Sequence, residues 1–338
     1  MDSPVGNTAP VMAEVWRGGF LESFHTGHAV IANAKGEIVE AWGDPDLVVL
    51  PRSSAKMIQA LPLLESGAAK AAGLEDRHLA LACASHQGAA IHTDLVQEWL
   101  KEIGRNDADF RCGPQEPSDR EARDGLIRAG ESPCQMHNNC SGKHTGFLTL
   151  TRHLKADGEY IAPDHPVQKA VKDAFEEVTG EVSPGFGIDG CSAPNHACSL
   201  AGMARAMAFF AAAPEDGSLR EQSAHRLVRA MMTYPELVAG ETRACTELMR
   251  AAKGRVALKT GAEAFFVAMI PEAGLGIALK ISDGTTRASE CAIAALLVRL
   301  GVLEKDHPAT LKRMNAPIRN WRGIETGVLK PGAALIAP

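Results

Sequence analysis

The chain has 338 residues, which is enough to bury a substantial hydrophobic core and allows one large domain or two. Hydrophobic residues form 45% of the sequence and charged residues 22%, a balance typical of a globular protein and not of a disordered or fibrous one. The formal net charge of -6 supplies no basic field, so we expect neither nucleic acid nor an anionic membrane as a partner.

The ends and the apolar segments of the chain predict a cytoplasmic protein. The N-terminal run Met1-Asp2-Ser3-Pro4-Val5-Gly6 has no basic segment followed by an apolar stretch, so no signal peptide is expected. Arg205 and Arg299 interrupt the longest apolar helical segments, which argues against a membrane span of about 20 residues. The 8 cysteines form no C-x-x-C pair, and we expect them to be reduced, most of them as small core residues.

The first part of the chain reads as strands and the middle as helices. Residues 11–19, 25–33 and 38–42 have strand character, and a tight turn joins the last two. From Ser53 onward the apolar residues recur at helical spacing. Further helices are expected at residues 93–103, 143–155, 199–212, 218–233 and 243–252.

Beyond Gly254 the pattern returns to strands. Residues 255–260, 263–270 and 276–281 form a predicted meander, followed by an amphipathic helix at 286–300 and a polar C-terminal tail. The sequence therefore predicts an α/β protein of the α+β type, a single domain spanning residues 1–338. Its antiparallel sheet combines N-terminal strands (about 11–42) with C-terminal strands (about 255–282), flanked by helices, with a mostly helical central region at about 53–253.

The first candidate site is the run Arg52-Ser53-Ser54-Ala55-Lys56 at the start of the helical part. If a helix begins at Ser53, Lys56 lies three residues on along the same face, within reach of the serine hydroxyl. A serine becomes a good nucleophile when a base takes its proton, and lysine can be that base if its surroundings lower its pKa from about 10.4. The alternative is a serine N-cap followed by a surface lysine.

Two further motifs place a serine at a turn and a lysine at a strand end. Ser85 follows an apolar run and precedes a predicted helix; the alternative there is a plain turn of small polar residues. Lys259-Thr260-Gly261 ends a predicted strand. In penicillin-recognising enzymes a K-T-G strand faces the S-x-x-K serine, and the order of the motifs here agrees with that arrangement.

Two polar runs contain cysteines that could bind zinc. One run contains Cys140 and His144 and ends at a predicted helix start; the other, bracketed by glycines, contains Asp189 and Cys191. Cys140 and Cys191 with Asp189 or His144 could be ligands, although metal sites generally bring their ligands in closer pairs. Cys245 lies in a fainter motif, where the sequence favours a core cysteine over a site residue.

Together these runs resemble a known family, the rhizobial-type (class 3) L-asparaginases. The similarity extends from about residue 15 to about residue 301. It is carried by Arg52-Ser53-x-x-Lys56, Ala84-Ser85-His86, Asn139-Cys140-Ser141-Gly142-Lys143-His144, Gly187-Ile188-Asp189-Gly190-Cys191 and Lys259-x-Gly261-Ala262-Glu263. The resemblance implies a serine β-lactamase-like and glutaminase-like fold, a homodimer, and hydrolysis of L-asparagine to L-aspartate and ammonia.

The resemblance also implies a role for each matching residue. The catalytic residues would be two serine-lysine tandems, Ser53 with Lys56 and Ser85 with Lys259. The zinc ligands would be Cys140, Lys143 and Cys191, with Asp189 beside the metal. The substrate pocket would be lined by Arg52, His144, Cys245 and Glu263. One departure is present: the family's Gly-Ala-Glu is followed by glycine, whereas this chain has Ala264.

Our hypothesis is an amidohydrolase in which Ser53 attacks the side-chain amide and Lys56 takes its proton. Ser85 and Lys259 would then relay a proton to the departing ammonia. Three questions stay open: whether Ser53 or Ser85 is the nucleophile, whether zinc positions substrate or is structural, and how far glutamine is also hydrolysed. The alternatives are a β-lactamase or D,D-peptidase-like serine hydrolase and a non-catalytic zinc-stabilised amino-acid-binding protein.

Overall fold

The computed structural model describes residues 9–336, so the N-terminal run expected to lack a signal peptide lies outside the described residues. The chain divides into two compact units. Among the described residues, the sheet unit comprises residues 9–49, 199–212 and 247–336, and the helical unit comprises Leu50–Cys198 and Ala213–Thr246. That residues 1–338 act as a single domain stays a prediction.

The sheet unit contains a mixed set of N- and C-terminal strands. Its strands are β1 (Val11–Arg17), β2 (Phe20–Ala32), β3 (Ile38–Trp42), β4 (Val48–Val49), β8 (Ala257–Thr260), β9 (Phe265–Ile270), β10 (Leu275–Ile281), β11 (Ala316–Arg319) and β12 (Glu325–Pro331). An antiparallel sheet runs in the order β11-β12-β1-β2-β10-β9-β8, with β3 also paired to β2. The predicted antiparallel sheet of terminal strands is confirmed.

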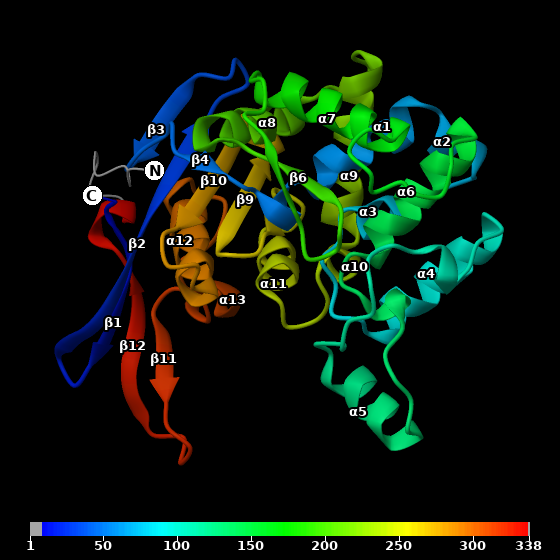
Figure 1. Ribbon diagram of the computed structural model, residues 1–338. Helices are drawn as coiled ribbons and strands as arrows, with labels where there is room; N and C mark the ends of the chain where they lie inside the picture. Colours follow the sequence, from blue (N-terminus) through cyan, green and yellow to red (C-terminus); the bar gives the residue numbers. More distant parts are fainter. Residues whose placement is uncertain (1–8, 337–338) are drawn as a thin grey trace. The chain divides into compact units, whose positions relative to one another are not determined.

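The C-terminal tail is not the polar tail that the sequence predicted. Its residues form β11 and β12, and β12 pairs along β1, with Val15 opposite Leu329 (Figure 1). Leu329 is buried, but its neighbours in the strand are mostly half-buried, so the local sequence carries little apolar alternation. The prediction was wrong because the pairing partner of this strand lies at the other end of the chain.

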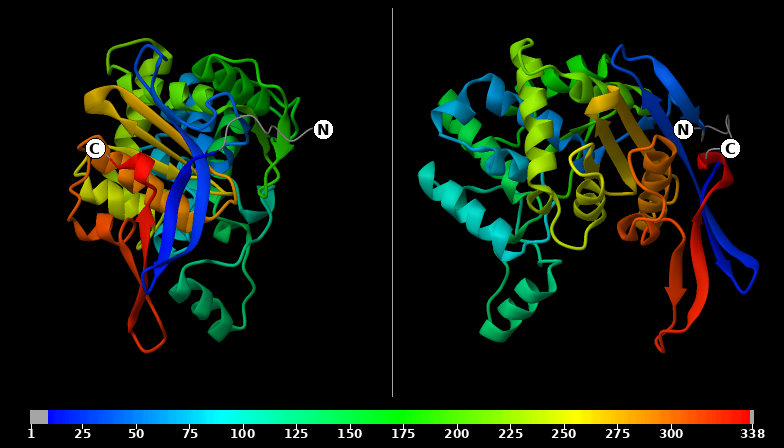
Figure 2. Two further views of the ribbon diagram at one scale, coloured as in Figure 1. Left: turned by 90° about the vertical axis from the view of Figure 1, so that its left-hand side faces the viewer. Right: turned by 180° about the vertical axis from the view of Figure 1, so that it is seen from behind.

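Helices α8 (Leu200–Ala212) and α12 (Thr286–Arg299) pack on this sheet, and η4 (Pro271–Ala273), α13 (Pro308–Leu311) and η5 (Ala333–Leu335) complete the unit. Gly276 in β10 lets α8 pack closely on this strand, because a Cβ atom there would lie 2.0 Å from the backbone nitrogen of Ala208. The view from behind in Figure 2 shows α12 beside β12.

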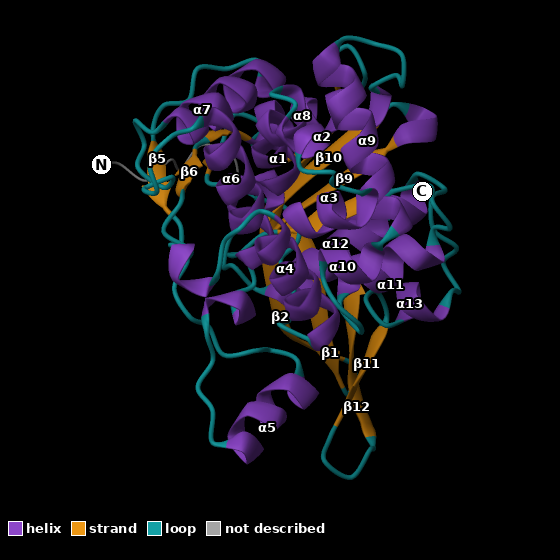
Figure 3. Cartoon of the chain, turned by 90° about the vertical axis from the view of Figure 1, so that its right-hand side faces the viewer, coloured by secondary structure: helices purple, strands orange, loops and turns teal. Residues whose placement is uncertain are grey.

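The helical unit is built around α1 (Lys56–Glu65), which packs against α6, α7 and α9 (Figure 3). Eight consecutive residues of α1, from Lys56 to Leu63, are buried. The remaining elements are η1 (Arg52–Ala55), α2 (Ala68–Ala71), α3 (Asp76–Ala82), α4 (Ala90–Glu102), η2 (Asp107–Asp109), α5 (Arg120–Ala129), η3 (Gln135–His137), α6 (Ser141–Leu154), α7 (Pro166–Thr179), β5 (Phe186–Ile188), β6 (Pro194–His196), α9 (Leu219–Thr233) and α10 (Pro235–Val238). Two elements, β7 (Cys198–Ser199) and α11 (Ala244–Ala251), each contain residues of both units. Among the helices within residues 9–336, none combines the length and apolar character needed to cross a bilayer.

Two glycines of α6 meet their neighbours very differently. A Cβ atom on Gly142 would lie 2.2 Å from the backbone oxygen of Leu81 in α3. On Gly146, one helical turn later, the nearest atom would be a side-chain carbon of Leu63 at 3.4 Å, an ordinary contact. Gly142 therefore sets how closely α6 approaches α3.

We predict that Gly142→Ala lowers the free energy of unfolding by about 2 kcal/mol or more, because overpacking against a backbone atom forces the helices apart. Gly146→Ala is the matched control, and its gain in helix propensity of up to about 1 kcal/mol should leave stability unchanged or higher. Urea unfolding measures both. Equal effects of the two substitutions would contradict the close α6–α3 approach.

Candidate functional site

The run that opens the helical part enters α1 through a tight turn. Arg52 adopts a left-handed backbone with φ of 52°, and η1 precedes α1, which begins at Lys56. In a 3₁₀ turn, residues three apart eclipse each other, so Ser53 stays on the same side of the chain as Lys56. Ser53 is half-buried and Lys56 is completely buried.

The Lys56 amine contacts the loop that carries Ser85 and one neighbouring main-chain carbonyl. Lys56 Nζ lies 3.0 Å from Ser85 Oγ, 2.5 Å from the Ala84 carbonyl oxygen and 3.5 Å from the Asn139 carbonyl oxygen. The Ser85 backbone nitrogen donates to the Val238 carbonyl at 2.9 Å, which fixes the loop that presents this serine. Within the helical unit, the structure thus pairs Lys56 with Ser85.

A second buried cluster contains the predicted zinc ligands. Cys140 caps α6, Lys143 lies in its first turn, and Cys191 lies in the turn between β5 and β6. All three side chains are buried, and Lys143 Nζ lies 3.0 Å from Cys191 Sγ. The Cys140 thiol donates to Asn139 Oδ1 at 3.0 Å and interacts electrostatically with Cys191. The structure therefore brings the three residues together.

The three buried groups shift one another's pKa values. The neighbouring Cys140 side chain, then the charge of Lys143, hold the pKa of Cys191 well below its usual range. The Cys191 side chain and burial raise the pKa of Cys140. Burial alone would lower the pKa of Lys143, but the thiolate of Cys191 and its partner outweigh it, and the pKa is raised.

His144 lies next to this cluster with one ring nitrogen fixed. The Arg111 backbone nitrogen donates to the Tyr160 hydroxyl oxygen at 2.8 Å, and the Tyr160 hydroxyl lies 2.9 Å from His144 Nδ1. The hydroxyl proton is therefore available to Nδ1, and Nε2 carries the ring proton. Among residues 9–336, Nε2 has no hydrogen-bond partner. Burial first, and then the charge of Lys143, lower the pKa of His144 to about 4.

An ion pair ties the entrance of α1 to the segment that carries Cys191. Arg52 Nε and Nη2 lie 2.8 and 2.7 Å from Asp189 Oδ1. The Asp189 backbone closes a turn with Ser192, whose amide donates to the Asp189 carbonyl at 2.8 Å. Arg52 and Asp189, both predicted site residues, are thus brought together beside Cys191.

The donor set of the cluster fits zinc. No group of three or more His, Cys, Asp or Glu side chains within the described residues could hold a metal ion, so Cys140 and Cys191 would need Lys143 as a third donor. Thiolate sulfur and nitrogen are ligands that zinc prefers. An amine binds a metal only after losing its proton, so such a site would couple metal affinity to pH.

The other predicted site residues lie elsewhere in the chain. Cys245 is buried near the start of α11. Lys259 and Glu263 belong to the sheet unit, where Lys259 Nζ donates to the Thr260 carbonyl at 2.8 Å. Glu263 and Ala264 both have left-handed backbones, with φ of 55° and 54°. The alanine that replaces the family's glycine therefore adopts the conformation that glycine favours.

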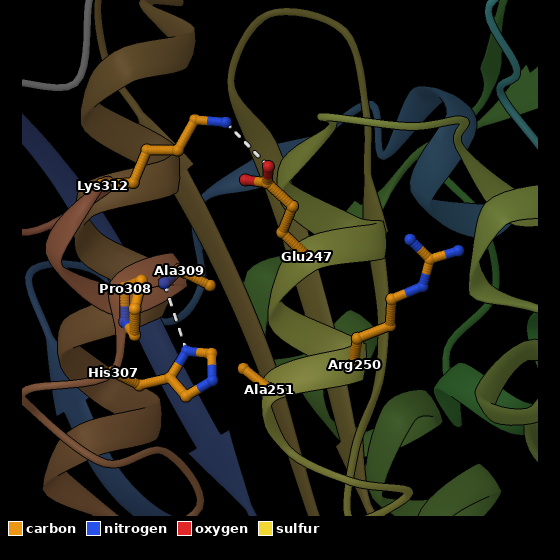
Figure 4. Close-up of a pocket in the computed structure, with 7 residues that line it drawn as sticks. All are labelled: Glu247, Arg250, Ala251, His307, Pro308, Ala309 and Lys312. Atoms are coloured by element: carbon orange, nitrogen blue, oxygen red, sulfur yellow. Dashed lines mark hydrogen bonds and ion pairs between the residues drawn. The ribbon is translucent and has the colours of Figure 1, made fainter.

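A cavity of about 380 Å³ also lies within the sheet unit (Figure 4). Its lining consists of Glu247, Arg250, Ala251, His307, Pro308, Ala309 and Lys312. Lys312 Nζ is paired with Glu247 at 2.7 Å, and His307 Nδ1 accepts from the Ala309 amide at 3.2 Å. None of the predicted site residues lines this cavity.

Sequence reasoning missed the groups that hold the serine and lysine in place. The Asn139 carbonyl accepts a hydrogen bond from the His86 amide at 3.2 Å as well as from Lys56. A main-chain carbonyl has no residue-type signature, so no spacing rule could find it. His86 could have been suspected only from its position beside Ser85.

Comparison with known proteins identifies the family. A model of the L-asparaginase II family matches residues 13–331. The chain belongs to this family. It is therefore an enzyme, an amidohydrolase of the L-asparaginase type that acts on a small amino-acid amide, and the resemblance found from the motifs is confirmed. A search of curated proteins gives no match.

Solved structures show weaker likenesses to this L-asparaginase II family member. A β-lactamase from Mycobacterium bovis shares 12% sequence identity over 81% of this chain and 94% of its own, with a TM-score of 0.46. Mglu, solved in its tris and glutamate form, shares 13% identity over 89% of this chain and 65% of its own, with a TM-score of 0.44.

Acidification should destabilise the helical unit. Burial lowers the pKa of His78 and His92, so both stay neutral in the folded chain where an unfolded chain would bind protons. Their stabilising contribution is therefore present above about pH 6.5 and is lost as the pH falls below it. Calorimetry between pH 7.5 and 5.5 should show a falling Tm, and His92→Gln, which keeps the donor to Glu236, should reduce the slope. A Tm that rises on acidification would contradict this.

Proposed function

We propose that this enzyme hydrolyses the side-chain amide of L-asparagine to L-aspartate and ammonia through a serine-lysine mechanism. One observation carries the mechanism: the completely buried Lys56 has its Nζ 3.0 Å from Ser85 Oγ. A buried lysine beside a serine hydroxyl is the pair that an amidohydrolase needs to activate a nucleophile without a histidine. Membership of the L-asparaginase II family supports asparagine as the substrate.

In the proposed reaction, Ser53 Oγ attacks the carbon of the side-chain amide while neutral Lys56 takes the hydroxyl proton. Lys56 passes a proton to Ser85 Oγ, and Ser85 gives its own proton to the amide nitrogen. The carbon–nitrogen bond breaks, ammonia leaves, and an ester joins Ser53 to the aspartyl group. Water then attacks the ester, the same groups remove its proton and return one to Ser53, and L-aspartate leaves.

Ser85 is a second candidate for the nucleophile. A neutral Lys56 amine can donate to the Ala84 carbonyl and still accept the Ser85 hydroxyl proton, and the 3.0 Å contact supports that transfer. In that case Ser85 would carry the acyl group and Ser53 would bind substrate. The two assignments differ in which serine becomes covalently modified.

We also propose zinc at Cys140, Lys143 and Cys191. The buried 3.0 Å contact between Lys143 and Cys191, together with the buried Cys140 side chain at the start of the same helix as Lys143, supports this donor set. When bound, zinc would supply a fixed positive charge for the α-amino and carboxylate end of the substrate. Arg52 holds Asp189 next to this cluster, so this pair would keep the Cys191 turn in position.

Several parts of the proposal come from the family resemblance. It gives substrate contacts to Arg52, His144, Cys245 and Glu263, and a proton-relay role to Lys259. It also predicts a homodimer, and the sequence predicts a cytoplasmic location. Light scattering after gel filtration tests the dimer, and ammonia release by Lys259→Met tests the relay.

Substitution of Lys56 should remove most of the amidohydrolase activity. Lys56→Met preserves the buried stem and should lower kcat for ammonia release from L-asparagine by about 1,000-fold or more. Ser53→Ala and Ser85→Ala should each lower kcat as well, and mass spectrometry of the enzyme quenched during turnover should find the aspartyl adduct on Ser53. An adduct on Ser85 would favour the second candidate.

The matched control is Lys70→Met, which changes a lysine on the short helix α2 in the same unit. It should leave kcat unchanged. L-glutamine and a chromogenic cephalosporin are assayed in parallel, because turnover of the cephalosporin alone would favour a β-lactamase-like enzyme. Ligand-induced thermal shift without any turnover would favour an amino-acid-binding protein and contradict the proposal.

Zinc content should depend on the cluster. Cys191→Ser should lower bound zinc, measured by plasma mass spectrometry, from about one ion per chain to about one tenth of that or less, because one of only two thiol donors is lost. Cys134→Ser, at a half-buried cysteine hydrogen-bonded to His137, is the control and should retain zinc. Wild-type protein that holds no zinc after purification in zinc-containing buffer would contradict the site.

A further inference from the structure

His86 sits at the junction between the Ser85 loop and the start of α6. Its side chain is buried, with 1% of its surface exposed. The Gly88 amide donates to His86 Nδ1 at 3.1 Å, and His86 Nε2 lies 2.9 Å from Ser141 Oγ. Ser141 Oγ in turn donates to the Met136 carbonyl at 2.9 Å.

This chain of contacts fixes where the ring proton lies. Because Nδ1 accepts the Gly88 amide proton, the neutral ring must carry its proton on Nε2. The Ser141 hydroxyl gives its single proton to Met136, so its oxygen is free to accept from Nε2. The donor and the acceptor are therefore fixed in each hydrogen bond from Gly88 through His86 and Ser141 to Met136. The imidazole ring cannot flip without breaking its two hydrogen bonds.

The backbone of His86 adds a second link between the same two segments. Its amide donates to the Asn139 carbonyl, the group that also accepts from Lys56. The ring stacks on His92 of α4, with centroids 4.7 Å apart and planes inclined by 10°. His92 Nε2 is itself held by the Glu236 carbonyl at 2.9 Å.

We propose that His86 is a positioning residue for amide hydrolysis, and that its Nε2 proton, donated to Ser141, holds Ser85 in reach of Lys56. The inference rests on the proposed function, in which Ser85 relays a proton or carries the acyl group. The His86 ring contacts Gly88, Ser141 and His92, so it acts on Ser85 through the loop it anchors. The hydrogen bond donated by Nε2 links the Ser85 loop to α6, whereas the bond accepted by Nδ1 stabilises only the local turn at Gly88.

Two substitutions separate these features. In His86→Gln the amide nitrogen occupies the place of Nε2 and can still donate to Ser141, whereas in His86→Asn the shorter side chain can accept from Gly88 but cannot reach Ser141. We expect His86→Asn and His86→Ala to lower kcat for L-asparagine about 10- to 100-fold, with KM changed less than about threefold. His86→Gln should keep at least about a third of the wild-type kcat.

Ser141→Ala tests the other end of the bond. It should lower kcat as much as His86→Ala, and the double variant should be no worse than either, since both remove the same link. His78→Ala is the control: His78 is buried in the same unit, and its Nδ1 accepts the Glu75 amide at 3.1 Å. It should lower Tm and leave kcat unchanged below the melting range.

Nitrogen-15 spectra of the histidine-labelled wild-type protein provide a readout that needs no turnover. They should show His86 neutral with the proton on Nε2 between pH 6 and 8. Three results would each overturn the inference. They are a ring proton on Nδ1, a kcat of His86→Asn within twofold of wild type, and equal losses of kcat in His86→Gln and His86→Ala. A wild-type enzyme that releases no ammonia would instead reject the proposed function, and the spectra would still decide the position of the proton. If His86→Ala does not fold, the kcat values of His86→Gln and His86→Asn alone test the inference.

Discussion

The burial of one amine, that of Lys56, constrains the whole helical unit. A lysine nitrogen removed from water is costly unless its hydrogens and lone pair find partners. The carbonyl of Ala84, the hydroxyl of Ser85 and the carbonyl of Asn139 supply them, from two separate loops. Both loops must therefore be in place before α1 can bury its first residue. The contact with Ser85 that the proposed mechanism uses is thus also one of the contacts that offset the cost of burying Lys56.

A second buried lysine, Lys143, meets the same cost in a different way. Its charge is balanced by the thiolate of Cys191 instead of by carbonyl oxygens. The two lysines lie on α1 and α6, which pack directly against each other, and Gly142 lets α6 approach α3 closely as well. Packing and electrostatics are thus not separate here, because the glycine that allows the close approach lies one residue before the charged group.

The sequence predicts the fold class and the candidate site residues, but not the pairing of distant strands or the main-chain partners of the site. The antiparallel sheet follows from short apolar segments such as the continuous run of β9, and the candidate site residues follow from motifs whose residue types are chemically specific. The pairing of β12 with β1 could not be predicted, since it joins opposite ends of the chain. Nor could the partners of Lys56: two of its three acceptors are main-chain carbonyls, whose positions depend on the fold and on no particular side chain.

The position of β1 in the sheet has a consequence for biosynthesis. This strand is made first, yet one of its two neighbours, β12, is made almost last, as the pair Val15 and Leu329 illustrates. At about 5–20 residues per second, the ribosome would need roughly 15 to 60 s between the two. Throughout that interval β1 presents an open hydrogen-bonding edge to the cell. A chain that terminates early, before Glu325, would keep that edge permanently and would be prone to join the edges of other unfinished chains.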